Sequence, residues 1–146
     1  MASPPSLLKL LIDTNVVLDV ILERKPWVED ATALLDAIAR GRAMGHLAGH
    51  AVTTVHYVVE RERSRAVAAT AVSDLLQVLA VVSLGAPDFQ RALGLGLRDF
   101  EDGVQAAACL QIGADYLVTR NEKDYKGAPI ALRSAAEVLA ILTSRE

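Results

Sequence analysis

Residues 7–22 read LLKLLIDTNVVLDVIL, and their pattern indicates the class of fold. The apolar run Leu7–Ile12 is short and ends at Asp13, which predicts a buried strand. Asp13 and the two residues after it are of types that cap helices, and Val16–Leu22 continues as a predicted helix. A buried strand that passes directly into a helix is typical of a chain in which strands and helices alternate.

The same alternation continues along the rest of the chain. Further strands are predicted at Ala43–Leu47, at Val78–Ser83, at Asp115–Thr119 and around Ile130. Further helices are predicted at Val28–Arg40, Ala51–Arg63, Arg65–Leu76, Pro87–Gly94, Asp99–Ile112 and Ser134–Leu142, and a polar loop at Arg120–Gly127. Strands that alternate with helices predict a three-layer α/β/α sandwich around a mostly parallel central sheet.

Length and composition indicate one globular domain. The 146 residues are the length of a single domain, which we expect to cover residues 1–146. Apolar residues make up 52% and charged residues 23%, which argues against disorder. The net charge of −3 excludes a global attraction to nucleic acid, so any contact with RNA must be local or helped by a metal ion. Aromatic residues, at 4%, are too few for a base-stacking platform.

The number of cysteines and the pattern of apolar residues predict the cellular compartment. Cys109 is the single cysteine, so an intramolecular disulfide is excluded, which fits a reducing cytosol and predicts a cytoplasmic protein. The apolar stretch Leu10–Leu22 is interrupted by polar residues and does not read as a signal peptide. No run of about 18 uncharged apolar residues occurs, which argues against a membrane span.

Acidic residues follow the predicted strands. Asp13 ends the first strand, Asn121 and Asp124 follow the strand that ends at Thr119, and Asp99 and Asp102 begin a helix. Ligands of parallel sheets bind beyond the carboxyl ends of the strands, where these side chains would gather. Carboxylates brought together raise each other's pKa unless a cation neutralises them, and oxygen ligands favour Mg²⁺ or Mn²⁺ over zinc. The sequence therefore predicts a divalent metal site.

Each acid also has a purely structural interpretation. Asp13 is placed to cap the helix that follows it, and Asp99 is a natural N-cap with Asp102 at the third helical position. Asp124 by itself reads as a surface turn residue. The prediction of a metal site rests on the combination of these acids.

Several motifs together resemble the PIN domain, the metal-dependent ribonuclease fold that includes VapC-type toxins, and in particular its PIN_3-type subgroup. The motifs are LIDTNV at Leu11–Val16, DFEDGVQAA at Asp99–Ala107, VTRNEKDY at Val118–Tyr125, and the closing segment of Ile130 with Ser134–Leu142. The resemblance covers nearly the whole chain. It implies the same α/β/α sandwich that the alternation predicts.

The resemblance assigns roles by position. It implies that Asp13, Asp102 and Asp124 are catalytic and bind the metal, with Asp99 as a further ligand or a support one helical turn away. The supporting residues that it implies are Thr14, Asn15, Thr54, Thr119 and Asn121. The implied activity is Mg²⁺- or Mn²⁺-dependent hydrolysis of RNA phosphodiester bonds by the toxin of a type II toxin–antitoxin pair. The implied partners are a small antitoxin and a second copy of the chain.

One departure from the family pattern keeps a second function open. The family usually carries a glutamate on its third helix, where Thr54 stands here, and Glu60 lies on another side of the helix. A hydroxyl binds a metal more weakly than a carboxylate, so the alternative is a PIN-like module that binds RNA or protein with weak or no catalysis. A phosphoryl-transfer domain with Asp13 as acceptor is disfavoured, because no second aspartate follows Asp13 by two positions.

Histidine and tryptophan carry no predicted chemistry. The three histidines, His46, His50 and His56, have no carboxylate or nucleophile partner at a diagnostic spacing. We expect Trp27 to pack against the second helix or to lie at a dimer contact.

Overall fold

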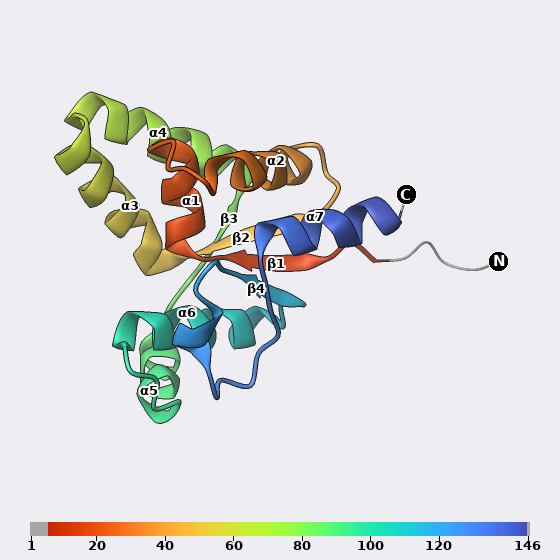
Figure 1. Ribbon diagram of the computed structural model, residues 1–146. Coiled ribbons are helices and arrows are strands. Elements are labelled where there is room, and N and C mark those ends of the chain that lie inside the picture. The colour runs from red at the N-terminus through yellow and green to blue at the C-terminus, as the bar shows by residue number, and fades with distance from the viewer. Residues whose placement is uncertain (1–5, 146) are drawn as a thin grey trace.

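The structure is a computed structural model that describes residues 6–145, so the predicted domain of residues 1–146 extends past the described residues at both ends (Figure 1). Its centre is a five-stranded sheet in the order β3-β2-β1-β4-β5, and every pairing is parallel. The strands are β1 (Lys9–Ile12), β2 (Met44–Ala48), β3 (Ala80–Val82), β4 (Tyr116–Val118) and β5 (Leu132–Arg133).

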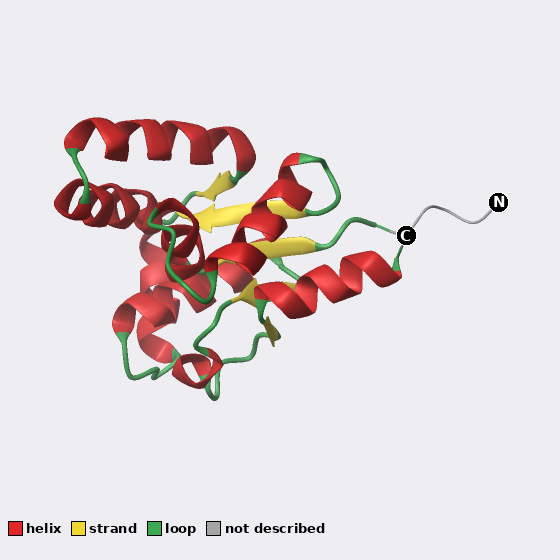
Figure 2. Cartoon of the chain, turned by 45° about the horizontal axis from the view of Figure 1, so that its top comes forward, coloured by secondary structure: helices red, strands yellow, loops and turns green. Residues whose placement is uncertain are grey.

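Helices cover both faces of this sheet, as Figures 1 and 2 show, and this confirms the predicted three-layer α/β/α sandwich. On one face lie α1 (Thr14–Ile21), α2 (Val28–Ala39), α3 (Gly49–Glu62), α4 (Arg65–Val78) and α7 (Ala135–Ser144). On the other lie α5 (Ala86–Gly94), α6 (Phe100–Ile112) and the 3₁₀-helix η1 (Glu122–Tyr125). In the described part, none of the helices is long and apolar enough to cross a membrane.

Strand β1 joins the two halves of the core. Leu10 and Ile12 point into the layer of α1–α4 and α7, whereas Leu11 points into the layer of α6, and all three are 0% exposed. Alternate side chains of a strand face opposite sides of a sheet, so a strand buried on both faces needs a continuous apolar run. Each such side chain contributes about 1.5–3 kcal/mol of hydrophobic stabilisation.

Local capping sets the helix ends much as the sequence predicts. The Ser64 hydroxyl accepts a hydrogen bond from the Val67 N–H at 3.1 Å and begins α4. Ser134 and Glu137 form a reciprocal capping box at the start of α7. Gly113 ends α6 with a left-handed φ of 62°.

The boundaries differ from the predicted ones where tertiary contacts decide them. Val78 ends α4 rather than opening a strand, because the helix continues to a 2.8 Å hydrogen bond from the Leu79 N–H to the Leu75 carbonyl oxygen. Ile130 lies outside β5, since its N–H closes a tight turn onto Ala128 at 2.9 Å. The predicted polar loop contains η1, and α3 begins two residues early, at Gly49.

The strand order creates a switch point at the centre of the sheet. From β1 the chain runs to β2 and β3 on one side, and β4 and β5 extend the sheet on the other side of β1. Because all strands are parallel, their carboxyl ends meet at one edge, and the crevice at such a switch point is where open α/β sheets bind ligands. The residues that follow β1, β2 and β4 therefore define the candidate site.

Gly49 provides a test of this packing, because a Cβ built on it would lie 2.8 Å from the carbonyl oxygen of Val82. We expect Gly49→Ala to lower the free energy of unfolding by about 1–3 kcal/mol, since the clash is with backbone and overpacking costs this much. Urea denaturation measures the change. Gly94→Ala is the matched control, because nothing lies within 4 Å of its added Cβ, and we expect an effect within about 0.5 kcal/mol. Equal stabilities for the two variants would contradict the close approach of α3 to β3.

Candidate functional site

Asp13 is the innermost acid of the site. It follows β1, is 5% exposed, and its N–H donates to the Val118 carbonyl oxygen of β4 at 2.9 Å. Its Oδ2 accepts hydrogen bonds from the Thr119 hydroxyl at 2.8 Å and the Tyr125 hydroxyl at 3.3 Å. Its Oδ1 accepts from the Asn15 N–H at 3.4 Å, so Asp13 also caps α1. The structural interpretation is therefore correct for this residue, and the same carboxylate stands at the switch point.

Burial sets the electrostatics of Asp13. Loss of water raises the pKa of its carboxyl group, and the hydrogen bonds from Thr119, Asn15 and Tyr125, with the charge of Arg120, offset only part of that rise. A neighbouring positive charge would therefore stabilise the ionised form of this buried carboxylate.

Asp99 and Asp102 approach from the start of α6. Asp99 is the N-cap of this helix, and its Oδ1 accepts from the Asp102 N–H at 3.2 Å. Burial, followed by the negative charges of Asp99, Asp13 and Asp124, raises the pKa of Asp102 to about 7. The structure thus brings Asp13 and Asp124, from two distant segments, close enough to act on Asp102 together with its neighbour Asp99.

A buried hydrogen bond that the sequence did not reveal fixes α6 against α1. Gln105 is 1% exposed, and its Nε2 donates to the Thr14 hydroxyl at 2.6 Å. Gln105 lies three residues after Asp102, so both are on one face of the helix. A glutamine inside the otherwise apolar run Gly103–Cys109 is the signal that would have identified this anchor.

Tyr125 is a second residue that the sequence reading missed. Its side chain is 1% exposed, and its hydroxyl lies between the carboxylates of Asp13 and Asp102. Burial and the two negative charges raise the pKa of the phenol, so it stays protonated and available as a donor. A tyrosine directly after the last acid was the available signal, because a buried hydroxyl requires a partner.

The outer acids line an open hollow of about 630 Å³. Its charged lining residues are Arg98, Asp99, Asp102, Lys123, Asp124 and Lys126. Among the described residues, the ion pairs include none of the three acids of this lining. Within residues 6–145, the hollow therefore combines cations with carboxylates that have no ion-pair partner, a composition that can hold a metal ion and contact phosphates.

Of the other predicted residues, Thr119, Asn121 and Asn15 are linked to Asp13 by hydrogen bonds, whereas Thr54 is not. Thr119 connects the Asn121 N–H, at 3.0 Å, to Asp13, so it positions both. Asn15 contributes its backbone N–H. The Thr54 hydroxyl donates to the His50 carbonyl oxygen at 3.3 Å, within its own helix.

His50 is a third residue that the sequence reading missed. Its Nε2 lies 3.8 Å from Glu101 Oε1, and both ring nitrogens are buried without a hydrogen-bond partner. Burial lowers the pKa of the imidazole more than the charge of Asp13 raises it. The sequence spacing gave no sign of the contact with Glu101, because Glu101 lies on a distant helix. His56 lies 3.6 Å from Glu60, four residues along the same helix. His50 follows β2 at the carboxyl edge, so the rule that selected Asp13 would have found it.

The carboxylate oxygens of Asp13, Asp99, Asp102 and Asp124 suit a hard divalent cation, because they are negatively charged oxygen ligands. Mg²⁺ is bound through one or two carboxylates and keeps several waters, so it needs no closed cage of protein ligands. Within residues 6–145, no group of three or more histidine, cysteine, aspartate or glutamate side chains is close enough together to hold a metal ion. The acids therefore provide an open, oxygen-rich site and not a preformed one.

Asp102 predicts how stability depends on pH in the metal-free protein. In the folded protein the Asp102 carboxyl group keeps its proton up to about pH 7, whereas in the unfolded chain it has the ordinary pKa of 3.8. The free energy of unfolding therefore falls as the pH rises between these two values. We expect Asp102→Asn to remove that loss and to raise the melting temperature at about pH 8 in EDTA, with a smaller effect near about pH 4. Thermal melts across this range measure it. Asp36→Asn, which removes an exposed aspartate of α2 and its surface ion pair with Arg40, is the control. Parallel pH profiles for wild type and Asp102→Asn would contradict the raised pKa.

Comparison with solved structures shows the same fold in three other proteins. VapBC2 from Rickettsia felis, solved bound to a DNA fragment from its promoter, superposes with a TM-score of 0.69 at 16% identity, covering 86% of this chain and 97% of that one. VapC20 from Mycobacterium tuberculosis, a sarcin-ricin loop cleaving toxin, gives 0.66 at 15% identity, covering 84% and 96%. FitAcB from Neisseria gonorrhoeae gives 0.62 at 19% identity, covering 87% and 98%.

Comparison of the sequence itself gives the family. No curated protein is significantly similar to the chain. The family model of the PIN domain, in its PIN_3 form, matches residues 9–123, which include β1, the start of α6 and the first half of η1. The chain belongs to the PIN domain family, as its motifs predicted, and it is VapC-like in fold.

Proposed function

We propose that this protein is a Mg²⁺- or Mn²⁺-dependent ribonuclease that hydrolyses RNA phosphodiester bonds and acts in the cytoplasm as the toxin of a type II toxin–antitoxin pair. The observation that carries the proposal is the position of Asp102. Its pKa is raised to about 7 by burial and by carboxylates from the end of β1, the start of α6 and η1. Strongly perturbed acids that face an open hollow are typical of catalytic sites.

The proposal gives each group a role. One or two of the acids Asp13, Asp102, Asp124 and Asp99 would hold the ion directly, and the others would act through its bound waters. The ion would supply an activated water and neutralise charge on the phosphate. The protein itself keeps Asp13 fixed through Thr119 and Tyr125.

Local cations supply the contact with RNA that the net charge of −3 does not. Arg98, Lys123 and Lys126 line the same hollow as the acids, where they can contact phosphates on either side of the bond to be cut. VapC20, which shares the fold, is described as a toxin that cleaves the sarcin-ricin loop, which supports RNA as the substrate class.

One observation favours the second candidate function, a PIN-like module that binds RNA or protein without cleaving it. The Thr54 hydroxyl is engaged by the His50 carbonyl oxygen, and Glu60 is exposed on another side of α3. The site therefore lacks the carboxylate that the family usually provides from this helix.

Cleavage of a mixed-sequence single-stranded RNA distinguishes the two functions. We expect the wild type to cleave with Mn²⁺ or Mg²⁺ and to stop in EDTA. Asp102→Asn should lose at least about 100-fold in rate, because it removes a carboxylate that contacts the reacting ion. Asp36→Asn, the same substitution at an exposed site, should retain full activity.

Two results would contradict the nuclease proposal. Cleavage that persists in EDTA or in Asp102→Asn would point to a different site or a contaminant. RNA binding without cleavage under any metal would support the binding module.

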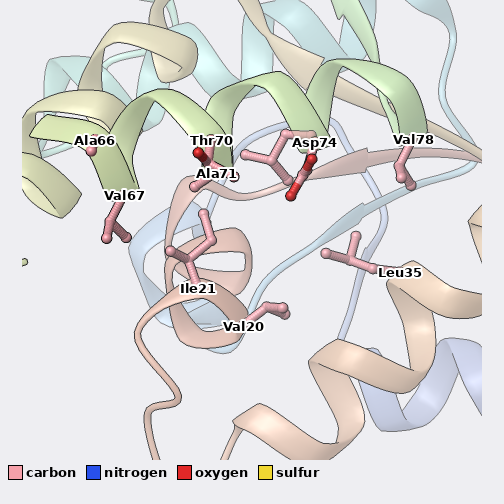
Figure 3. Close-up of a pocket in the computed structure, with 10 residues that line it drawn as sticks. Val20, Ile21, Leu35, Ala66, Val67, Thr70, Ala71, Asp74 and Val78 are labelled. Carbon is pink, nitrogen blue, oxygen red and sulfur yellow. The ribbon is translucent and has the colours of Figure 1, made fainter.

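We also propose where the antitoxin binds. An apolar hollow of about 550 Å³ lies between α4, α1 and α2 (Figure 3). Figure 3 shows Val67 and Val78 of α4 facing Ile21 of α1 and Leu35 of α2, with Asp74 among them. This surface suits one apolar face of an amphipathic helix that carries a basic residue opposite Asp74. The presence of VapBC2 and FitAcB among the structural neighbours supports a small partner protein.

A charge placed in this hollow tests the antitoxin site. We expect Val67→Glu to abolish co-purification with the product of an adjacent small open reading frame, because a carboxylate would be buried without a partner. RNA cleavage by the variant should be unchanged. Leu76→Glu is the matched control, since Leu76 is an exposed residue of the same helix outside the hollow. Loss of the complex in both variants, or in neither, would contradict the site.

The proposal includes a homodimer, which the family resemblance implies. Exposed apolar side chains of α5 and of the start of α6 support it. Phe89 and Leu93 lie one helical turn apart on α5, and Phe100 begins α6. A second copy of the chain would bury this surface.

A further inference from the structure

The side chain of Arg120 stacks on the indole ring of Trp27. The guanidinium carbon of Arg120 lies 3.7 Å from the ring centroid of Trp27, and the indole remains 41% exposed. Arg120 also donates to both carboxylate oxygens of the buried Asp19, from Nε at 2.8 Å and from Nη2 at 3.3 Å. The cation is thus fixed at three points, and the expectation that Trp27 serves only packing or a dimer contact does not account for this arrangement.

A hollow of about 300 Å³ opens beside this stacked pair. Its apolar walls include Val16, Ala31 and Pro26. Its polar lining residues are Thr119, Ser134, Asp30 and Asp19, and Asp19 is neutralised by Arg120. A small, largely apolar hollow with a few polar groups is typical of a site for part of a ligand, at the lower end of the range of about 300–1,000 Å³.

Shared lining residues link this hollow to the acidic one. A third hollow lies between them and shares Lys123 with the acidic one. It shares Thr119, Arg120 and Ser134 with the hollow beside Trp27. The three hollows are therefore neighbours along the path from Asp102 past Lys123 to Trp27, and the buried Thr119, which holds Asp13, lies beneath this path.

We propose that the hollow beside Trp27 and Arg120 binds one unpaired base of the RNA strand whose phosphates cross the acidic hollow. The proposal rests on RNA being the substrate, as argued above, and not on catalysis. Unstacked bases bind to aromatic rings and to the planes of arginine side chains, and every base offers such a face. The low aromatic content still excludes a platform for several bases, whereas one base needs only one ring. The site would select single-stranded RNA over a duplex, because a paired base cannot enter it.

Intrinsic fluorescence reports directly on this site, because Trp27 is the only tryptophan of the chain. We would titrate the wild type in EDTA with a short single-stranded RNA of mixed sequence. A fluorescent label on the same RNA would give its affinity by anisotropy. We expect a saturable change in tryptophan emission with the same midpoint as the anisotropy.

Two substitutions of Trp27 distinguish a loss of base stacking from a general change in the structure. We expect Trp27→Leu to weaken RNA binding about tenfold, within the range for loss of one base–aromatic contact, and Trp27→Phe to restore most of it. Tyr57→Leu is the matched control: Tyr57 is an exposed ring with Arg61 at 5.5 Å from its centroid, and it lines none of the three hollows. The Tyr57→Leu variant should bind RNA with the affinity of the wild type.

Three results would overturn the base site. The first is that the wild type does not bind RNA in EDTA. The second is that the anisotropy of the labelled RNA saturates while the tryptophan emission stays unchanged. The third is that duplex RNA competes for the protein as well as single-stranded RNA does. If the wild type cleaves RNA with metal and Trp27→Leu binds and cleaves equally well, the nuclease stands and the base site fails. If binding depends on Trp27 and no metal supports cleavage, the base site stands and the nuclease fails.

Discussion

The buried carboxylate of Asp13 is the interaction on which the rest of the site depends. It stands where the central strand β1 ends and the sheet divides toward β2 and β4. A charge in this position costs free energy unless donors and a counter-charge surround it. Thr119 and Tyr125 provide the donors, and by doing so they place β4 and η1 beside the end of β1. The residues that make Asp13 tolerable thus also determine where the other acids lie.

The fold holds like charges together because apolar packing outweighs their repulsion. Helix α6 is buried from Gly103 to Cys109, and Gln105 attaches it to Thr14, so its acidic first turn cannot move away from Asp13. Asp102 is only half-buried, and solvent screens part of the repulsion that raises its pKa. A site whose like charges are costly in the free protein agrees with the general trade-off between stability and activity.

The class of fold follows from the sequence alone, and the sequence also indicates which acids lie at strand and helix ends. The apolar run before Asp13, with the cap residues after it, predicts a strand buried on both faces and a helix, and the structure has both. Capping at Ser64 and Ser134 and the left-handed Gly113 act within a few residues, so they can be read locally. The family motifs add positions for the acids, because those positions are tied to strand and helix ends.

Only the tertiary structure decided which other side chains join the acids. Tyr125, Gln105 and His50 lie far from Asp13 in the sequence, and their positions depend on the order of the strands and on how α3 and α6 pack. Val78 has the β-branched shape of a strand residue, yet the continuing hydrogen bonds of α4 keep it helical. The contact of Arg120 with Trp27 also joins distant segments, through the buried Asp19. Local patterns record propensity and periodicity, whereas these contacts arise from burial across the whole fold, which no short stretch of sequence contains.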